Sequence, residues 1–188
     1  VDAVIWTHDH ADHCHGIDDL RQLFYLLRRP VAGFASPTTM EALRRRFGYV
    51  FSGNDGYPAT ATLSELEGEA SIGTFNVQST EQPHGPTCST GLRISAGEAS
   101  IGYAIDFSAI TPEMLAHYSD VDLLITDCLR DYPHPTHAHT DLALQLISQT
   151  ASKTALLTHM DKSMDYETVA AMVPPHIRPA YDGWTLTL

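Results

Sequence analysis

Four histidines and one aspartate lie close together near the start of the printed chain: His8, His10, Asp12, His13 and His15. Neutral imidazole nitrogens and carboxylate oxygens are the ligands that divalent zinc, manganese or iron accept in proteins. His8 and His10 are two residues apart, so they point the same way in an extended segment and can bind one ion. Asp12 and His13 follow after the chain has begun to turn, so they can face a second ion. The cluster therefore predicts a metal site in preference to a histidine-rich surface loop.

The residues on either side of this cluster predict the elements that position it. The apolar run VDAVIW at residues 1–6 is typical of a strand that is buried on both faces. Apolar residues then recur at helical spacing between Asp18 and Arg29, and Pro30 stops that helix. A surface tract or tag would have neither element, so the metal cluster belongs to a folded strand–loop–helix unit.

Further polar residues stand at the ends of predicted strands. His84 lies in a turn of Pro and Gly after a strand-like segment. Asp106 ends the apolar run 99–105, and a carboxylate there needs a partner to offset its desolvation. His159 follows the predicted strand 154–157. Asp127, after the predicted strand 121–125, either accepts a hydrogen bond from a ligand histidine or caps a turn.

The pattern His8-x-His10-x-Asp12-His13 after a hydrophobic strand resembles the signature of the metallo-β-lactamase superfamily. The segments DDLR at 18–21 and HPTH at 134–137 are similar to the branch that includes the cyclic phosphodiesterase of the carbon–phosphorus lyase pathway. This resemblance covers essentially the whole chain. It implies an α+β fold, the αββα sandwich, as one domain over residues 1–188. It also implies further strands before Val1, so we expect the printed chain to lack an N-terminal part of that domain.

The same resemblance implies two divalent ions, zinc or manganese, and a metal-bound hydroxide as the nucleophile. The ligands that it implies are His8, His10 and His84 for the first ion, Asp12, His13 and His159 for the second, and Asp106 as the bridge. Asp12 is thereby also a catalytic residue.

The metals do not supply a proton for a leaving alkoxide, so an imidazole outside the ligand set is expected to do so. His137, 22 positions before His159, matches the general acid of the phosphodiesterase branch. His139, near the start of the next helix, is the alternative. His134 is a candidate for orienting the other two.

The resemblance implies hydrolysis of a small or cyclic phosphodiester. The alternatives on the same scaffold are a lactone or thioester hydrolase and a nuclease of the tRNA 3′-processing type. A redox enzyme or a non-enzymatic relative is disfavoured because every implied ligand position is filled. A β-lactamase is disfavoured because the Asp12-His13 pair with Asp106 is the phosphodiesterase-type arrangement.

Composition narrows the partners. The formal net charge is −12, with 11 Lys and Arg against 23 Asp and Glu, which argues against a nucleic-acid partner. No apolar run approaches the roughly 18 residues of a membrane span, so we expect no membrane partner. Cys14, Cys88 and Cys128 are scattered and odd in number, which fits a reducing cytoplasm. The partners expected are therefore a small-molecule phosphodiester and, among proteins, a second copy in a homodimer.

Four weaker patterns complete the interpretation. The consecutive residues Arg44, Arg45 and Arg46 are interpreted as a solvated helix face rather than an anion site. The non-periodic segment 51–64 is expected to be an irregular loop, and Tyr49, Phe51 and Tyr57 either line a substrate wall or pack. Thr140 is the expected cap of a helix over 141–151. The alternating tail WTLTL at 184–188 predicts an edge strand.

Overall fold

Two units are distinguished by the contacts that the chain makes with itself, residues Val1–Gly73 and Thr74–Leu188. The computed structural model describes residues 1–66 and 68–188. The expectation of one domain over residues 1–188 stays a prediction.

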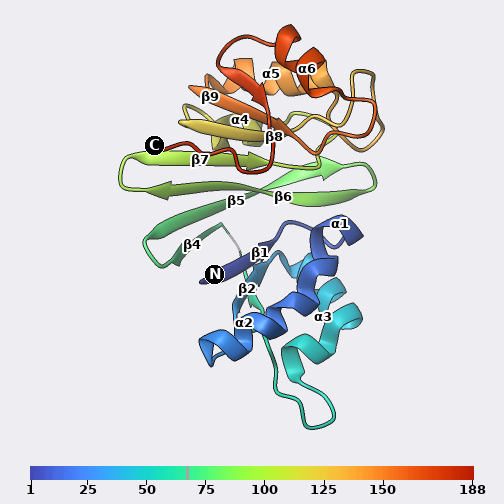
Figure 1. The fold of residues 1–188 in the computed structure, drawn as a ribbon, viewed down its shortest axis with the longest axis vertical. Coiled ribbons are helices and arrows are strands. Elements are labelled where there is room, and N and C mark those ends of the chain that lie inside the picture. Colours follow the sequence, from blue (N-terminus) through green and yellow to red (C-terminus); the bar gives the residue numbers. More distant parts are fainter. Residues whose placement is uncertain (67) are drawn as a thin grey trace. The chain divides into compact units, whose positions relative to one another are not determined.

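The first unit contains three short parallel strands in the order β1 (Ala3–Trp6), β2 (Ala32–Ala35) and β3 (Ser64–Glu65) within its described residues (Figure 1). β1 leads into the short helix α1 (Ala11–Cys14), a 3₁₀ turn η1 (His15–Asp19) and α2 (Leu20–Leu27). The strand and helix around the histidine cluster are therefore confirmed. The expectation that β1 is buried on both faces is wrong, because Trp6 alone among residues 3–6 is fully buried.

The longest helix of this unit is α3 (Pro37–Ser52). Ser36 caps its start by accepting a hydrogen bond from the Thr39 backbone N–H at 3.4 Å, and Pro37 occupies the first turn, where no N–H is needed. Apolar residues of α2 and α3 pack against β1 and β2 in a core that includes Trp6, Leu20 and Leu43. The histidine loop therefore starts from a strand whose position the core fixes.

The segment after α3 is more ordered than its composition suggests. Asn54 and Tyr57 exchange two backbone hydrogen bonds of 2.8 and 3.1 Å. Asp55 and Gly56 between them both have positive φ, 47° and 83°, as a tight two-residue hairpin turn of type I′ requires. The expected irregular loop is therefore partly wrong, since α3 extends to Ser52 and a regular turn follows it.

A seven-stranded sheet dominates the rest of the described chain, in the order β10-β9-β8-β7-β6-β5-β4 (Figure 1). Its strands are β4 (Glu69–Ile72), β5 (Phe75–His84), β6 (Thr87–Ala96), β7 (Ala99–Ala104), β8 (Leu123–Asp127), β9 (Thr154–Thr158) and β10 (Ile177–Pro179). β6 is antiparallel to both β5 and β7, and β7 to β10 are parallel. Consequently β5, β7, β8 and β9 all end at the same edge of the sheet.

Helices α4 (Pro112–His117), α5 (Thr140–Thr150) and α6 (Tyr166–Met172) pack on this sheet through a core that includes Tyr118, Leu146 and Leu157. The expected cap at Thr140 is wrong: His139 is the N-cap residue of α5, and the Thr140 hydroxyl donates to Asp131 Oδ1 at 2.7 Å. The tail expectation is also wrong, because β10 ends at Pro179 and residues 184–188 form no strand.

The structure is thus a mixed α/β fold with sheets flanked by helices. No helix within residues 1–66 and 68–188 combines the length and the apolar composition needed to cross a membrane.

Candidate metal centre and proton donor

Polar residues stand at the ends of four strands that finish at one edge of the large sheet. His84 is the last residue of β5, Asp127 is the last of β8, and Asp106 and His159 closely follow β7 and β9. His137 reaches the same edge on the loop between β8 and α5. One ligand atom from each of Asp106, Asp127, His137 and His159 lies within 4.8 Å of the others. Parallel pairing therefore gathers donors that are far apart in the sequence.

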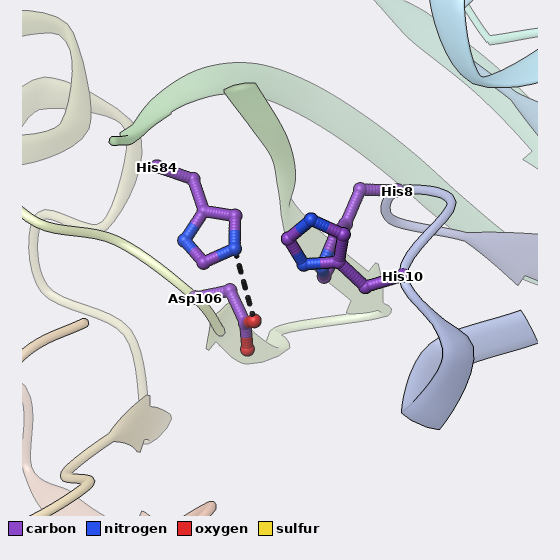
Figure 2. A group of neighbouring side chains, drawn as sticks. All are labelled: His8, His10, His84 and Asp106. Carbon is purple, nitrogen blue, oxygen red and sulfur yellow. Dashed lines mark ion pairs between the residues drawn. The ribbon is translucent and has the colours of Figure 1, made fainter. Parts of the chain in front are cut away.

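The Asp106 carboxylate lies at the centre of this set and is only 1 % exposed. Its Oδ2 is 3.4 Å from His84 Nε2, the ion pair drawn in Figure 2, and 3.7 Å from His137 Nδ1. Its Oδ1 is 3.6 Å from His159 Nε2. Burial and the Asp106 charge both raise the pKa of the nearby Tyr103 phenol, burial being the larger cause. Because imidazole nitrogens lie near both of its oxygens, the Asp106 carboxylate could bind one cation through each oxygen.

Asp127 orients His137. Its side chain is fully buried, and its Oδ2 accepts hydrogen bonds from His137 Nδ1 at 3.1 Å and from the Ala138 backbone N–H at 3.2 Å. Its Oδ1 is 3.6 Å from His159 Nδ1. Asp127 thus accepts from the backbone of the turn at 137–138, one of the two roles that the sequence left open, and also from His137, while its role as acceptor for a metal-ligand histidine stays a prediction.

His84 is held by the same loop. Its Nδ1 is 2.7 Å from the Thr136 carbonyl oxygen, and a carbonyl can only accept, so Nδ1 carries the proton. The lone pair is then on Nε2, the nitrogen directed at Asp106 (Figure 2). Such an outer hydrogen bond fixes the tautomer and ring orientation that a metal-ligating histidine needs. The Thr136 carbonyl has no side-chain signature, so the sequence did not reveal it.

Two of these residues have an unusual backbone. Asp106 and His159 have φ of 55° and 62°, in the left-handed region that non-glycine residues rarely adopt. Strained residues of this kind cluster at active sites and ligand clamps, where the surrounding structure holds them. The backbone geometry therefore singles out the same two residues as the side-chain distances.

The first unit holds a second set of donors on one loop. The His8 ring centroid is 4.6 Å from that of His10 and 4.4 Å from that of His13, and Figure 2 shows the first two rings side by side. His8 Nδ1 is 3.1 Å from the Thr7 hydroxyl, so Nε2 faces away from it. Asp12 Oδ2 is 3.2 Å from His13 Nε2. The loop thus brings together all four residues that the sequence motif predicted there.

The turn of this loop is set by α1. The His10 carbonyl accepts the backbone N–H groups of His13 and Cys14, both at 3.1 Å. The Cys14 thiol donates to the Asp9 carbonyl at 3.3 Å, and burial raises its pKa. Burial also raises the pKa of the Cys128 thiol to about 11. Both buried thiols are therefore protonated at neutral pH and act as small packing groups.

Arg46 contacts the histidine loop, although Arg44, Arg45 and Arg46 are all exposed, as the interpretation of a solvated face expects. Its guanidinium donates to the Asp9 carbonyl oxygen, lies 3.2 Å from Asp9 Oδ2, and is 2.7 Å from His15 Nε2. It also lies over the Phe47 ring at 5.1 Å. Arg46 thus ties α3 to both ends of the loop that carries His10 and His13. The sequence does not reveal this contact, because only the helix register shows which of the three adjacent arginines reaches the histidine loop.

The aromatic residues considered for a substrate wall have different environments. Phe51 packs edge-on against Trp6 at 5.9 Å. Tyr49 donates to Asp18 Oδ1 at 2.7 Å, and Tyr57 lies under the Arg21 guanidinium at 4.8 Å. Tyr49 and Tyr57 line an open cavity of about 490 Å³ together with Asp18 and Arg21. Arg21 is therefore an exposed charge at that cavity.

His134, His137 and His139 have three different environments. His137 stacks on His159 with ring centroids 5.1 Å apart and an interplanar angle of 16°. The His134 ring is 5.1 Å from that of His137, and burial, Arg130 and His137 lower its pKa, so it is neutral at neutral pH. His139 is the N-cap residue of α5 and belongs to none of the donor clusters found among the described residues.

The fold and the donor sets define a class of protein. Imidazoles and carboxylates at the ends of parallel strands, one carboxylate with imidazoles on two sides, are the donors that divalent transition metals take in hydrolytic enzymes.

The comparisons with known proteins agree. The model of the beta-lactamase superfamily domain matches residues 1–160. A crystal structure of a diphosphatase from the PhnP family superposes with a TM-score of 0.87 and 27% identity, covering 98% of this chain and 69% of that one. The metallo-beta-lactamase fold protein YhfI from Bacillus subtilis superposes with a TM-score of 0.81 and 19% identity, covering 98% and 76%.

An octanoyltransferase of Porphyromonas gingivalis is 30% identical over 189 aligned positions. The alignment takes in 97% of this chain but only 37% of that relative, so the chain spans little more than a third of its length. The family match over residues 1–160 shows that this chain belongs to the beta-lactamase superfamily. The fold class expected from the histidine motif is thereby confirmed.

The Arg46 contacts predict that this residue supports metal binding by the histidine loop. We expect Arg46→Ala to weaken binding of zinc or manganese about 10-fold or more, in the range typical of residues that orient metal ligands. The exposed neighbour Arg45 is the matched control, and Arg45→Ala should bind metal like the wild type. Titration calorimetry of the demetallated proteins measures both affinities. Equal affinities in the two variants would contradict this role for Arg46.

Proposed function

We propose that this chain is a phosphodiesterase that hydrolyses a small or cyclic phosphodiester with two divalent ions, zinc or manganese. The ligands proposed are His8, His10 and His84 for one ion, Asp12, His13 and His159 for the other, and Asp106 between them. His137 is the proposed general acid. The sequence motif assigns these roles, and the donor chemistry of each unit, described separately above, is compatible with them.

The observation that carries the proposal is the pairing of His137 with Asp127. A buried carboxylate that accepts from Nδ1 fixes the imidazole and leaves Nε2 as its second proton-bearing atom. His137 lies beside Asp106 and His159 without belonging to the seven-residue ligand motif. A hydrolase needs such a group where the leaving group departs as a poorly stabilised alkoxide. Phosphodiesters with alkyl leaving groups meet that description.

The residues have distinct tasks in this proposal. When bound, the two ions supply an activated water at neutral pH and stabilise charge on the phosphoryl oxygens. Thr136 and Asp127 keep the tautomers and ring planes of His84 and His137 fixed through hydrogen bonds. The His137 Nε2 position delivers a proton to the leaving oxygen. Neutral His134 beside it adds no competing positive charge.

The relatives support phosphorus chemistry more than acyl chemistry. The PhnP-family diphosphatase is 27% identical and is matched over 69% of its length. The octanoyltransferase name, which favours an acyl substrate, belongs to a protein of which 37% is matched. A thioester or lactone hydrolase is therefore the second candidate. The cytoplasmic location, the absence of a nucleic-acid partner and the homodimer stay predictions that rest on composition or resemblance.

The ligand assignment predicts two transition-metal ions per chain in fully loaded protein. His8→Ala and Asp106→Ala change residues of different units, and each should lower the metal content because each removes a ligand of a shared centre. Elemental analysis of protein purified without chelator gives the count, and anomalous scattering locates the ions. A single ion with full occupancy, unaffected by Asp106→Ala, would contradict the bridged arrangement.

The proposed reaction predicts that the protein hydrolyses bis(p-nitrophenyl) phosphate, a simple diester with a good leaving group. Activity should require manganese or zinc and should vanish on addition of a chelator, because the metals supply the nucleophile. Release of nitrophenolate measures the rate. A parallel panel of cyclic phosphates, lactones and thioesters is the comparison. Turnover of thioesters or lactones without turnover of any diester would favour the second candidate.

The role of His137 predicts a dependence on the leaving group. His137→Ala should keep both metals and should slow a diester with an alkyl leaving group by roughly 10²–10⁴-fold, the usual contribution of a positioned acid. It should slow a nitrophenyl diester much less, because nitrophenolate departs without a proton. His139→Ala is the matched control and should behave like the wild type with both substrates.

Two outcomes would overturn this assignment. Loss of metal in His137→Ala would make that residue a ligand. A leaving-group dependence confined to His139→Ala would move the general acid to the start of α5.

A further inference from the structure

A fully buried polar network links the ends of β5, β6 and β7. It consists of Gln82, Ser89 and Tyr118, whose side chains are at most 1 % exposed. Gln82 lies two residues before His84 on β5, so both side chains lie on the same face of the sheet. The strand register pairs Gln82 directly with Ser89 of β6. None of these residues carries chemistry that the proposed reaction uses, and no motif in the sequence selects them.

Every polar atom of the Gln82 amide is directed at a partner. Nε2 donates to Ser89 Oγ at 2.9 Å and to the Ile105 carbonyl at 2.8 Å. Oε1 accepts from the Tyr118 hydroxyl at 2.8 Å. Ser89 Oγ in turn lies 3.0 Å from the Ile105 carbonyl and 2.8 Å from that of Asp106. The network therefore converges on the backbone of Ile105 and Asp106.

These two carbonyls lie just past the point where the sheet stops supplying partners. β7 ends at Ala104, yet Ile105 and Asp106 are 2 % and 1 % exposed. A buried carbonyl that loses its ladder hydrogen bond must find another partner, and here the side chains of Gln82 and Ser89 provide it. They do so at the residue whose φ of 55° departs from the strand conformation.

The sheet leaves room for this network at Gly91, on the same face of β6 as Ser89. A Cβ at Gly91 would lie 1.9 Å from the Tyr118 hydroxyl and 2.7 Å from Gln82 Oε1. Any larger residue would separate Tyr118 from Gln82. The glycine thus permits the amide–phenol contact between Gln82 and Tyr118.

We propose that Gln82 and Ser89 are positioning residues that hold the Asp106 backbone in its left-handed conformation and thereby aim the carboxylate for metal binding. This inference rests on the proposed role of Asp106 as a metal ligand. The network acts through the Ile105 and Asp106 carbonyls and does not touch the metal or substrate. Its loss should weaken metal binding, as the loss of residues that orient a ligand does elsewhere.

Ser89→Ala tests the proposal most cleanly, because it removes one hydroxyl without adding bulk. Ser100→Ala is the matched control: Ser100 is also buried on this sheet, and its hydroxyl bonds Asp122 Oδ2 at 3.1 Å, outside the donor cluster. The full chain is demetallated and titrated with zinc, and its cobalt(II) form is measured by visible absorption. Thermal unfolding of the metal-free proteins records the stability change of each variant.

We expect Ser89→Ala to bind zinc about 10-fold or more weakly and to shift the cobalt(II) spectrum, while Ser100→Ala loses similar stability but keeps the wild-type affinity and spectrum. Gln82→Leu should enlarge the Ser89→Ala effect, and if it does not fold, Ser89→Ala decides alone. Wild-type affinity and spectrum in Ser89→Ala would overturn this proposal while leaving the proposed function intact. A wild-type chain that binds no metal would instead contradict the proposed function itself, and this inference with it.

Discussion

Burial of the Asp106 carboxylate is the constraint on which the second unit's site depends. A carboxylate that is 1 % exposed loses most of its hydration, and that cost must be offset by cations or hydrogen-bond donors. The surrounding structure provides imidazoles from β5, the β8–α5 loop and the end of β9. These imidazoles place nitrogen atoms around the buried carboxylate, and two divalent ions bound by them would offset its charge.

The same physical logic recurs at each histidine. A hydrogen bond at one ring nitrogen fixes the tautomer and the orientation of the other, and the chain provides a backbone carbonyl for His84, a proposed metal ligand, and a carboxylate for His137, the proposed general acid. Both partners come from the segment 127–136, so one loop sets the tautomers of two residues. In the first unit, Arg46 holds the backbone of the histidine loop by donating to the Asp9 carbonyl. It therefore positions the loop, whereas the partners of His84 and His137 position the rings themselves.

Membership of the beta-lactamase superfamily fixes the class of chemistry but leaves the substrate to local features. In the proposed function, the feature with most bearing on the substrate is the His137–Asp127 pair, because an imidazole held in this way can supply a proton that a metal centre alone does not. A phosphodiester requires that proton more than an activated acyl compound does. The acidic composition of the chain, with a formal net charge of −12, disfavours a long polyanionic substrate and agrees with a small one.

By itself, the sequence determined the metal chemistry and most of the elements. The spacing of His8, His10, Asp12 and His13, together with strand-end residues such as Asp106, follows from period-two alternation and apolar runs, which are local properties. Tertiary structure decided which of His137 and His139 reaches the cluster, which of three arginines contacts the histidine loop, and that Gln82 and Ser89 bond the backbone at Asp106. These depend on helix register, on pairing across β6 and on backbone carbonyls, and no residue type announces such contacts in the linear chain.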